Sequence, residues 1–306
     1  MADSYLTSAD VLNFNRVDLD VLVSDVLDST PFLQNAAART TASNNFKYTK
    51  LLTNPTVGYR AVNDGVENTD STYTQISLDL KYLDASFAID IAAAKVDERG
   101  QDHIVGIEAR NHLRAAMRLV EDNIFNTTSG GFSGFADQTN LNNIADAQVV
   151  SAGGTTPSTG SSVYAVKFGA SDCELLWGEG GEISVSPRMM IERAGSSTGR
   201  FWAWAHEISA YCGLKIGSIH SVHRLANITE DVGATLDDEL LAELYSTCPI
   251  EHKPDVFVMN RRSEKQLRAS RTATNIVGAP APYVTEAFGV KVIVTDAISS
   301  TEALLV

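Results

Sequence analysis

Residues 75–82 read QISLDLKY, a segment in which polar and apolar side chains alternate strictly. The apolar phase consists of Ile76, Leu78, Leu80 and Tyr82. Because successive side chains of a strand point to opposite faces, the pattern predicts a strand with one apolar and one solvated face. Such a face needs another surface to cover it.

The residues before this strand predict its partner. Residues 45–62 contain the strand-like runs NFKYTKLL and TVGYRAV, which Pro55 separates, and residues 63–72 are rich in turn-forming types. We therefore expect a long β-hairpin over residues 45–92, with arms of about 12 residues that reach roughly 40 Å. Because an isolated two-stranded hairpin is marginally stable in water, the apolar arm is expected to pack on a neighbouring subunit.

A long helix is predicted next, over residues 97–126. Its apolar side chains at helical spacing form one stripe, namely Leu113, Met117, Val120 and Ile124. Thirty residues of helix span about 45 Å, whereas a compact globule of this length has a radius of gyration of about 19 Å. The helix and the hairpin together therefore predict an extended, flat subunit.

The remaining pattern predicts a mixed α+β chain. Strand-like runs are expected at 163–169, 182–186, 200–211, 214–228, 255–260 and 288–296, and shorter helices at 16–28, 236–247 and 263–270. Asp237 and its acidic neighbours fit the N-terminal turn of the second of these helices.

Composition excludes several classes of protein. The 306 residues carry 24 basic and 38 acidic side chains, a net charge of −14, so strong DNA recognition by a basic domain is not expected. No run of 18 apolar residues occurs, and the N-terminus lacks a signal-peptide pattern, so we expect no membrane contact. Three widely separated cysteines argue against a disulfide framework and indicate a reducing cytoplasm.

The chemical motifs are weak. Gly195 to Gly199 matches GxSxG around Ser197, but the aromatic, strand-like RFWAWAHE follows where a nucleophile elbow needs a helix. His220 and His223 would point to opposite faces of a strand, and His206 lacks the second histidine of a zinc helix motif. We therefore predict no catalytic residue, no cofactor-binding residue and no metal ligand.

The order of these parts resembles the major capsid protein of tailed bacteriophages, with the Hong Kong 97-type fold. The stretches that carry the resemblance are DVLDSTPFL (25–33), NPTVGYRAVNDG (54–65), FAID (87–90), EDNIFN with GFSGFAD (121–137), VYAVKFG (163–169), GLKIGSIHSVHRLANI (213–228), VFVMN (256–260) and FGVKVIVTDAIS (288–299). Each is loose alone, and their order and spacing over residues 20–300 are the specific part.

The resemblance implies a division of the chain. It assigns residues 1–44 to an N-terminal arm, 45–92 to an extended hairpin called the E-loop, and 93–150 to a peripheral (P) domain with a spine helix at 97–126. Residues 151–260 would form mainly the axial (A) domain with returning P-domain strands, and 261–306 the end of the A domain and a closing P-domain strand.

The resemblance also implies a structural function. The chain would assemble with itself into hexamers and pentamers of an icosahedral head around double-stranded DNA, in the cytoplasm of a host bacterium. Expected intersubunit residues on the hairpin are Tyr59, Arg60, Ile76, Leu78 and Leu80. Expected basic residues that face other subunits or, non-specifically, the packaged DNA are Arg110, Arg114, Arg118, Arg261, Lys265 and Arg268.

Two departures from the best-known member affect the expected partners. No long N-terminal extension precedes the arm, so a separate scaffolding protein is expected, together with a portal and a cement protein. The tip, residues 63–72, holds no lysine, which argues against a cross-link made from it. Two alternatives remain open at this point: an encapsulin-like shell that holds a cargo enzyme, and a cytoplasmic hydrolase that uses Ser197.

Overall fold

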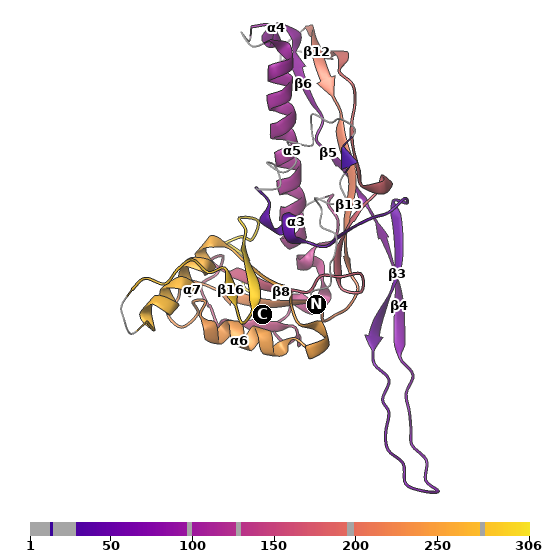
Figure 1. Cartoon of the computed structure of the whole chain (residues 1–306), viewed down its shortest axis with the longest axis vertical. Coiled ribbons are helices and arrows are strands. Elements are labelled where there is room, and N and C mark those ends of the chain that lie inside the picture. The colour runs from indigo at the N-terminus through magenta and orange to yellow at the C-terminus, as the bar shows by residue number, and fades with distance from the viewer. Residues whose placement is uncertain (1–12, 15–28, 97–99, 127–129, 195–198, 276–278) are drawn as a thin grey trace.

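The computed structural model describes residues 13–14, 29–96, 100–126, 130–194, 199–275 and 279–306. Figure 1 shows an elongated molecule in which the helix α5 (Gln101–Phe125) stands upright beside long strands. A wider body carrying α6 (Asp238–Thr247) and α7 (Arg261–Ala273) lies at its lower end, and a hairpin extends beyond that body. The extended shape expected from the sequence is therefore present.

The long helix follows its sequence pattern. The predicted stripe of Leu113, Met117, Val120 and Ile124 is buried. The first residues of the predicted span, 97–99, lie outside the described residues, as does the expected helix at 16–28.

The predicted hairpin is shorter than residues 45–92. Its paired arms are β3 (Asn45–Thr53) and β4 (Thr72–Asp79), and they pair antiparallel. The chain then leaves the hairpin, because β5 (Lys81–Asp84) pairs with β13 (Ile208–Ile216) and β6 (Phe87–Asp90) pairs with β12 (Arg200–His206). The alternating residues 75–82 thus belong to two different sheets: those up to residue 79 pair within the hairpin, and those from residue 81 pair with β13.

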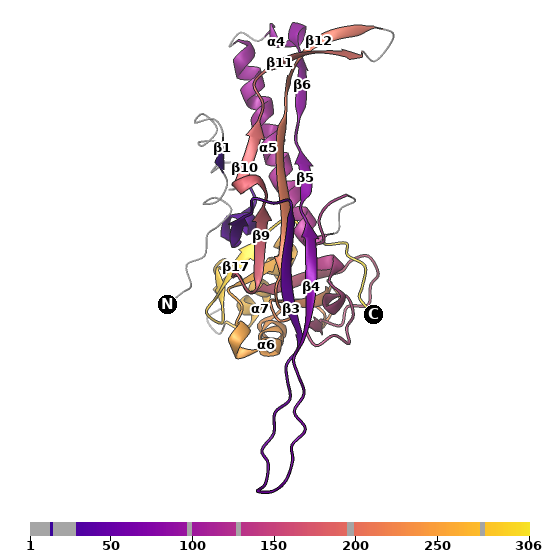
Figure 2. The ribbon, with the colours of Figure 1, turned by 90° about the vertical axis from the view of Figure 1, so that its right-hand side faces the viewer.

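Two sheets run along α5. The larger has the order β1 (Asn13–Phe14), β10 (Glu182–Val185), β13, β9 (Cys173–Trp177), β2 (Ala38–Thr40), with β5 also on β13. The other has the order β11 (Met189–Ala194), β12, β6, and Figure 2 shows it at the upper end near α4 (Ile91–Ala94). The run expected at 200–211 divides between β12 and β13.

The body contains a mixed sheet. Its order is β16 (Glu286–Ala287), β17 (Val290–Val294), β15 (Val256–Met259), β8 (Ser161–Val166), β14 (Val222–Ile228), β7 (Val149–Ser151). The helix α6 begins where predicted, because the Asp237 side chain accepts a hydrogen bond from the Leu240 N–H at 2.9 Å. The prediction of one strand over residues 214–228 was wrong, because residues 217–221 form a turn between β13 and β14.

One hydrophobic core lies where α5, the short helix α3 (Pro31–Asn35) and the sheets meet, and another lies between the body sheet and the helices α6 and α7. Phe32 of α3 packs edge-on against Phe125, with ring centroids 5.0 Å apart, and Phe135 and Tyr164 complete an aromatic cluster. Short 3₁₀ turns connect the elements: η1 (Phe135–Asp137), η2 (Thr139–Leu141), η3 (Glu179–Gly181) and η4 (Ile250–His252). Within the described ranges, no helix is long and apolar enough to cross a membrane.

Candidate functional site

The root of the hairpin is held by its own subunit. A Cβ atom added to Gly213 of β13 would lie 2.6 Å from Cδ2 of Leu80 and 3.4 Å from Cδ2 of Leu78, so these leucines pack directly on the strand backbone. Leu80 is 6% exposed, and Ile76 and Leu78 are half-buried. The expectation that this arm is uncovered in one subunit is therefore wrong for Leu80, because β13 covers it.

The other arm adds polar contacts to the same strand. The Tyr48 hydroxyl donates to the carbonyl oxygen of Ile216 at 3.2 Å. The Lys215 ammonium lies 5.7 Å from the ring centroids of both Phe46 and Tyr48 and forms a 3.5 Å ion pair with Glu174. Contacts from both arms therefore hold the base of the hairpin on β13.

The far end of the hairpin, residues 54–71, is different. A contact between the Thr56 and Thr69 hydroxyls, 2.6 Å apart, joins its two sides, and the apolar side chains beyond it are exposed. Val57 is 83% and Val62 91% exposed, and Tyr59 is fully exposed. Exposed apolar side chains gathered on a protruding segment indicate an interaction surface.

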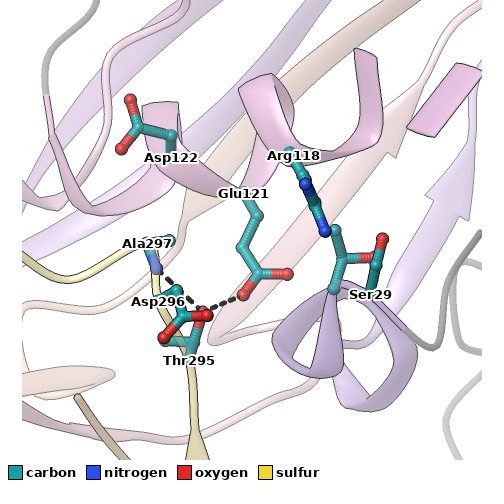
Figure 3. Close-up of a pocket in the computed structure, with 8 residues that line it drawn as sticks. Ser29, Arg118, Glu121, Asp122, Thr295, Asp296 and Ala297 are labelled. Atoms are coloured by element: carbon teal, nitrogen blue, oxygen red, sulfur yellow. Dashed lines mark hydrogen bonds between the residues drawn. The ribbon is translucent and has the colours of Figure 1, made fainter. Parts of the chain in front are cut away.

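The predicted basic row on α5 faces outward only in part. Arg110 and Arg118 are exposed, and Arg114 is half-buried. Arg118 lies at the rim of a cavity of about 310 Å³, formed by α5, the residues before α3 and the segment after β17 (Figure 3).

A buried carboxyl group lies inside this cavity. Glu121 is 2% exposed, and its Oε1 accepts a hydrogen bond from the Thr295 hydroxyl. Burial raises the pKa of Glu121 to about 7, and hydrogen bonds from Thr295 and from the backbone N–H groups of Leu33 and Phe32 oppose that rise. Glu121 thus joins α5 to α3 and to the C-terminal segment, a role that its sequence position did not indicate.

The second basic cluster, on α7, is largely engaged within the subunit. Arg261 pairs with Asp296, with Nε 2.7 Å from Oδ1. Arg268 donates to the carbonyl oxygen of Ala281 at 2.7 Å and stacks over the Tyr283 ring at 4.4 Å. Lys265 is exposed. Of the predicted face, Lys265 is thus the residue best placed to meet another molecule.

The chemical motifs fall in unremarkable places. Ser197 lies outside the described residues. His206 stacks on Phe87 at 5.4 Å and contacts the carbonyl oxygen of Ser186 through Nδ1. In the described part of the chain, no group of three or more His, Cys, Asp or Glu side chains is arranged to hold a metal ion.

One prediction from the motifs was wrong. His220 and His223 do not point to opposite faces, because His220 precedes β14 in a turn and the two rings stack with centroids 6.1 Å apart.

Comparisons with known proteins agree with this architecture. The family described as major capsid protein GP7 matches residues 22–306. The structure is similar to that of bacteriophage Epsilon15, with a TM-score of 0.64 and 16% identity over 88% of each chain. It is also similar to the bacteriophage JBD30 capsid, with a TM-score of 0.51 and 13% identity over 93% of this chain and 95% of that one. A comparison with curated proteins found no match.

Proposed function

Because this chain belongs to the major capsid protein GP7 family, we propose that its hairpin is the arm by which one subunit holds the next. The protein forms the shell of a phage head, so it is a structural component of the virion and not an enzyme. The family match therefore favours a phage head over the two alternatives, a cargo-holding shell and a serine hydrolase.

The arrangement of elements supports a Hong Kong 97-type division of the subunit. We assign residues 1–44 to the N-terminal arm, the E-loop to the hairpin within 45–92, and the spine helix to α5. The strands beside α5 would belong to the P domain, and the body with α6 and α7 to the A domain. Because β17 pairs with β15 in the body sheet, the closing strand within 261–306 belongs with the A domain in this assignment.

The observation that carries the proposed contact is the exposure of Val57, Tyr59 and Val62 on residues 54–71. Burying each such side chain stabilises a contact by about 1.5–3 kcal/mol. Closing a shell repeats one contact in every subunit, so a modest interface is sufficient. Arg60, beside Tyr59, would lie at the same contact, whereas Ile76 and Leu78 would contribute through their half-exposed edges.

The test is Val62→Asp, with Val232→Asp as its matched control. Both valines are exposed, so neither change should alter the thermal unfolding of the free subunit. Val62→Asp should leave free subunits by sedimentation and negative-stain microscopy, while Val232→Asp should give normal shells. Normal shells from Val62→Asp protein would contradict the hairpin contact, and loss of shells in both variants would indicate a general effect of added negative charge.

The remaining partners are proposed from the same family membership. The subunit would form hexamers and pentamers with a separate scaffolding protein, a portal and a cement protein; the JBD30 capsid is itself decorated with minor capsid protein trimers. Arg110, Arg114, Arg118 and Lys265 would meet neighbouring subunits or the packaged double-stranded DNA through non-specific contacts, with Arg261 and Arg268 in supporting positions. Such DNA contacts would weaken with added salt. Titrating DNA into shells of the unmodified protein and of the Lys265→Glu variant at several salt concentrations would measure the affinity that Lys265 contributes.

A further inference from the structure

Two connections between the large sheet and the body sheet lie next to each other. Residues 167–172 connect β8 to β9, and residues 217–221 connect β13 to β14. These two crossings contact each other, because the Gly217 N–H donates to the Asp172 carbonyl oxygen at 2.9 Å and the Lys167 N–H to that of Ser221 at 2.9 Å. A Cβ added to Gly217 would lie 2.2 Å from the Ser171 carbonyl oxygen, so the crossings pack without space between them.

Three of the six histidines of the chain gather at this junction. The His220 ring lies 6.1 Å from the His223 ring and 5.8 Å from the His252 ring, measured between centroids. His220 belongs to the second crossing, His223 to β14 and His252 to η4. His252 Nδ1 lies 2.8 Å from Oδ1 of Asp172, and the Ser221 hydroxyl reaches the same oxygen at 3.0 Å. The cluster therefore joins both crossings to the η4 loop.

The hydrogen bonds determine the tautomer of His223. The Thr247 hydroxyl donates its proton to the Leu244 carbonyl oxygen at 2.7 Å, so it must accept the bond from His223 Nδ1 at 2.9 Å. Nε2 of His223 therefore carries the lone pair, and it is buried with no hydrogen-bond partner among the described residues. Nδ1 of His220 is also buried and has no hydrogen-bond partner among the described residues. A proton added to His223 Nε2 would place a charge in a buried site, which burial disfavours.

We propose that His220 and His223, held beside the His252–Asp172 contact, form a pH-sensitive clip at this junction, closed while these two rings are neutral and loosened when mild acid protonates them. The inference concerns the subunit itself and does not depend on which surface the hairpin contacts. Its consequence is that acid weakens the contact between the two crossings, residues 167–172 and 217–221.

The charges around the cluster favour this behaviour. Asp172 is the carboxylate in contact with His252. The other charged side chains on the two crossings and η4 and beside them are Lys167, Glu251, Lys253 and Asp255, and the Asp255 carboxylate accepts the Phe168 N–H at 2.8 Å. On the elements that hold His223, Arg224 of β14 pairs with Glu302 at 2.9 Å, and α6 carries Asp238, Glu239 and Glu243. A positive charge on His252 would therefore be compensated by Asp172, whereas no ion pair joins His220 or His223 to a carboxylate among the described residues.

The pKa values act in the same direction. Burial, together with the neighbouring His220 and His252, lowers the pKa of His223 to about 4, against a backbone hydrogen bond to His220 that raises it. Burial and His252 also lower the pKa of His220. A histidine whose pKa is depressed in the closed state stabilises that state above the ordinary value of about 6.5, and this stabilisation is lost as pH falls from 6.5 towards 4.

The experiment is hydrogen exchange measured by mass spectrometry on the full chain at pH 7.5 and pH 5, corrected for the intrinsic pH dependence of exchange. Peptides covering 167–173 and 216–222 report the junction. A single histidine with a pKa of about 4 when closed and 6.5 when open increases the opening equilibrium about 30-fold at pH 5. Peptides of α5, which contains Glu121, should not show increased exchange at pH 5.

The variant His223→Asn separates titration from packing. Its amide can still donate to Thr247, but it cannot be protonated, so the increase at pH 5 should fall to a few-fold or less. His103→Gln on α5 removes a histidine elsewhere and should retain the full increase. If His223→Asn does not fold, His220→Gln provides the same comparison, and it should reduce the increase. Equal protection at both pH values in the unmodified protein, or an unchanged increase in the cluster variants, would overturn the proposal.

Discussion

Replacing Glu121 by glutamine should remove a pH dependence from the stability of the subunit. The carboxyl group is buried between α5, α3 and the C-terminal segment, and burial raises its pKa from 4.5 to about 7. The native state therefore binds more protons than the unfolded state between these pH values. Stability from this group is fully present below pH 4.5 and is lost as pH rises through 7.

The magnitude follows from the shift. A change of about 2.5 pKa units corresponds to about 3 kcal/mol, because each unit is worth about 1.4 kcal/mol. Glutamine resembles the protonated carboxyl group and keeps an oxygen that can accept from Thr295. Glu121→Gln should therefore match the unmodified subunit at pH 5 and exceed its free energy of unfolding by up to about 3 kcal/mol at pH 8.

Urea denaturation of the free subunit at pH 5, 6, 7 and 8 measures this difference. The matched control is Glu108→Gln on the same helix, which is only half-buried and should keep the pH dependence of the unmodified chain. Because the histidine cluster changes stability in the opposite direction over an overlapping range, the comparison is made between variants at each pH. Parallel pH profiles for Glu121→Gln and the unmodified subunit would refute the reasoning.

Three further outcomes are expected. Leu80→Ala should lower the free energy of unfolding by about 2–4 kcal/mol in urea, since Leu80 packs on β13 within one subunit; no loss would show that β13 does not hold the hairpin. Gly217→Ala should destabilise the subunit by on the order of 1–3 kcal/mol, because its Cβ would meet the Ser171 carbonyl oxygen, and an unchanged urea midpoint would contradict the close packing. Raising salt from low to moderate should speed assembly, measured by light scattering, because salt screens the repulsion between subunits of charge −14 within about 8 Å; a steady loss of assembly would show that ion pairs dominate the interfaces.

Several elements could be predicted because their signals are local. The buried stripe from Leu113 to Ile124 repeats at helical spacing, so it predicts the helix and its inner face without reference to the rest of the chain. Asp237 predicts a helix start for the same reason. The strict alternation of residues 75–82 predicts strand structure, and the order and spacing of all the parts carry the resemblance to phage capsid proteins.

The surfaces on which these elements pack were decided by the tertiary structure. Leu80 meets Gly213, Glu121 meets Thr295, and His252 joins a ring cluster with His220. Each pair is separated by many residues, so no short pattern records the contact.

The physical reason is the range over which a sequence pattern acts. Periodicity and helix capping depend on neighbours a few residues away, so the sequence by itself determined the long helix, the hairpin arms and the extended shape. Burial and the electrostatic environment depend on which distant segments share a space. The contacts between distant segments are therefore what place β13 over the root of the hairpin, bury Glu121 and leave the apolar side chains of residues 54–71 exposed.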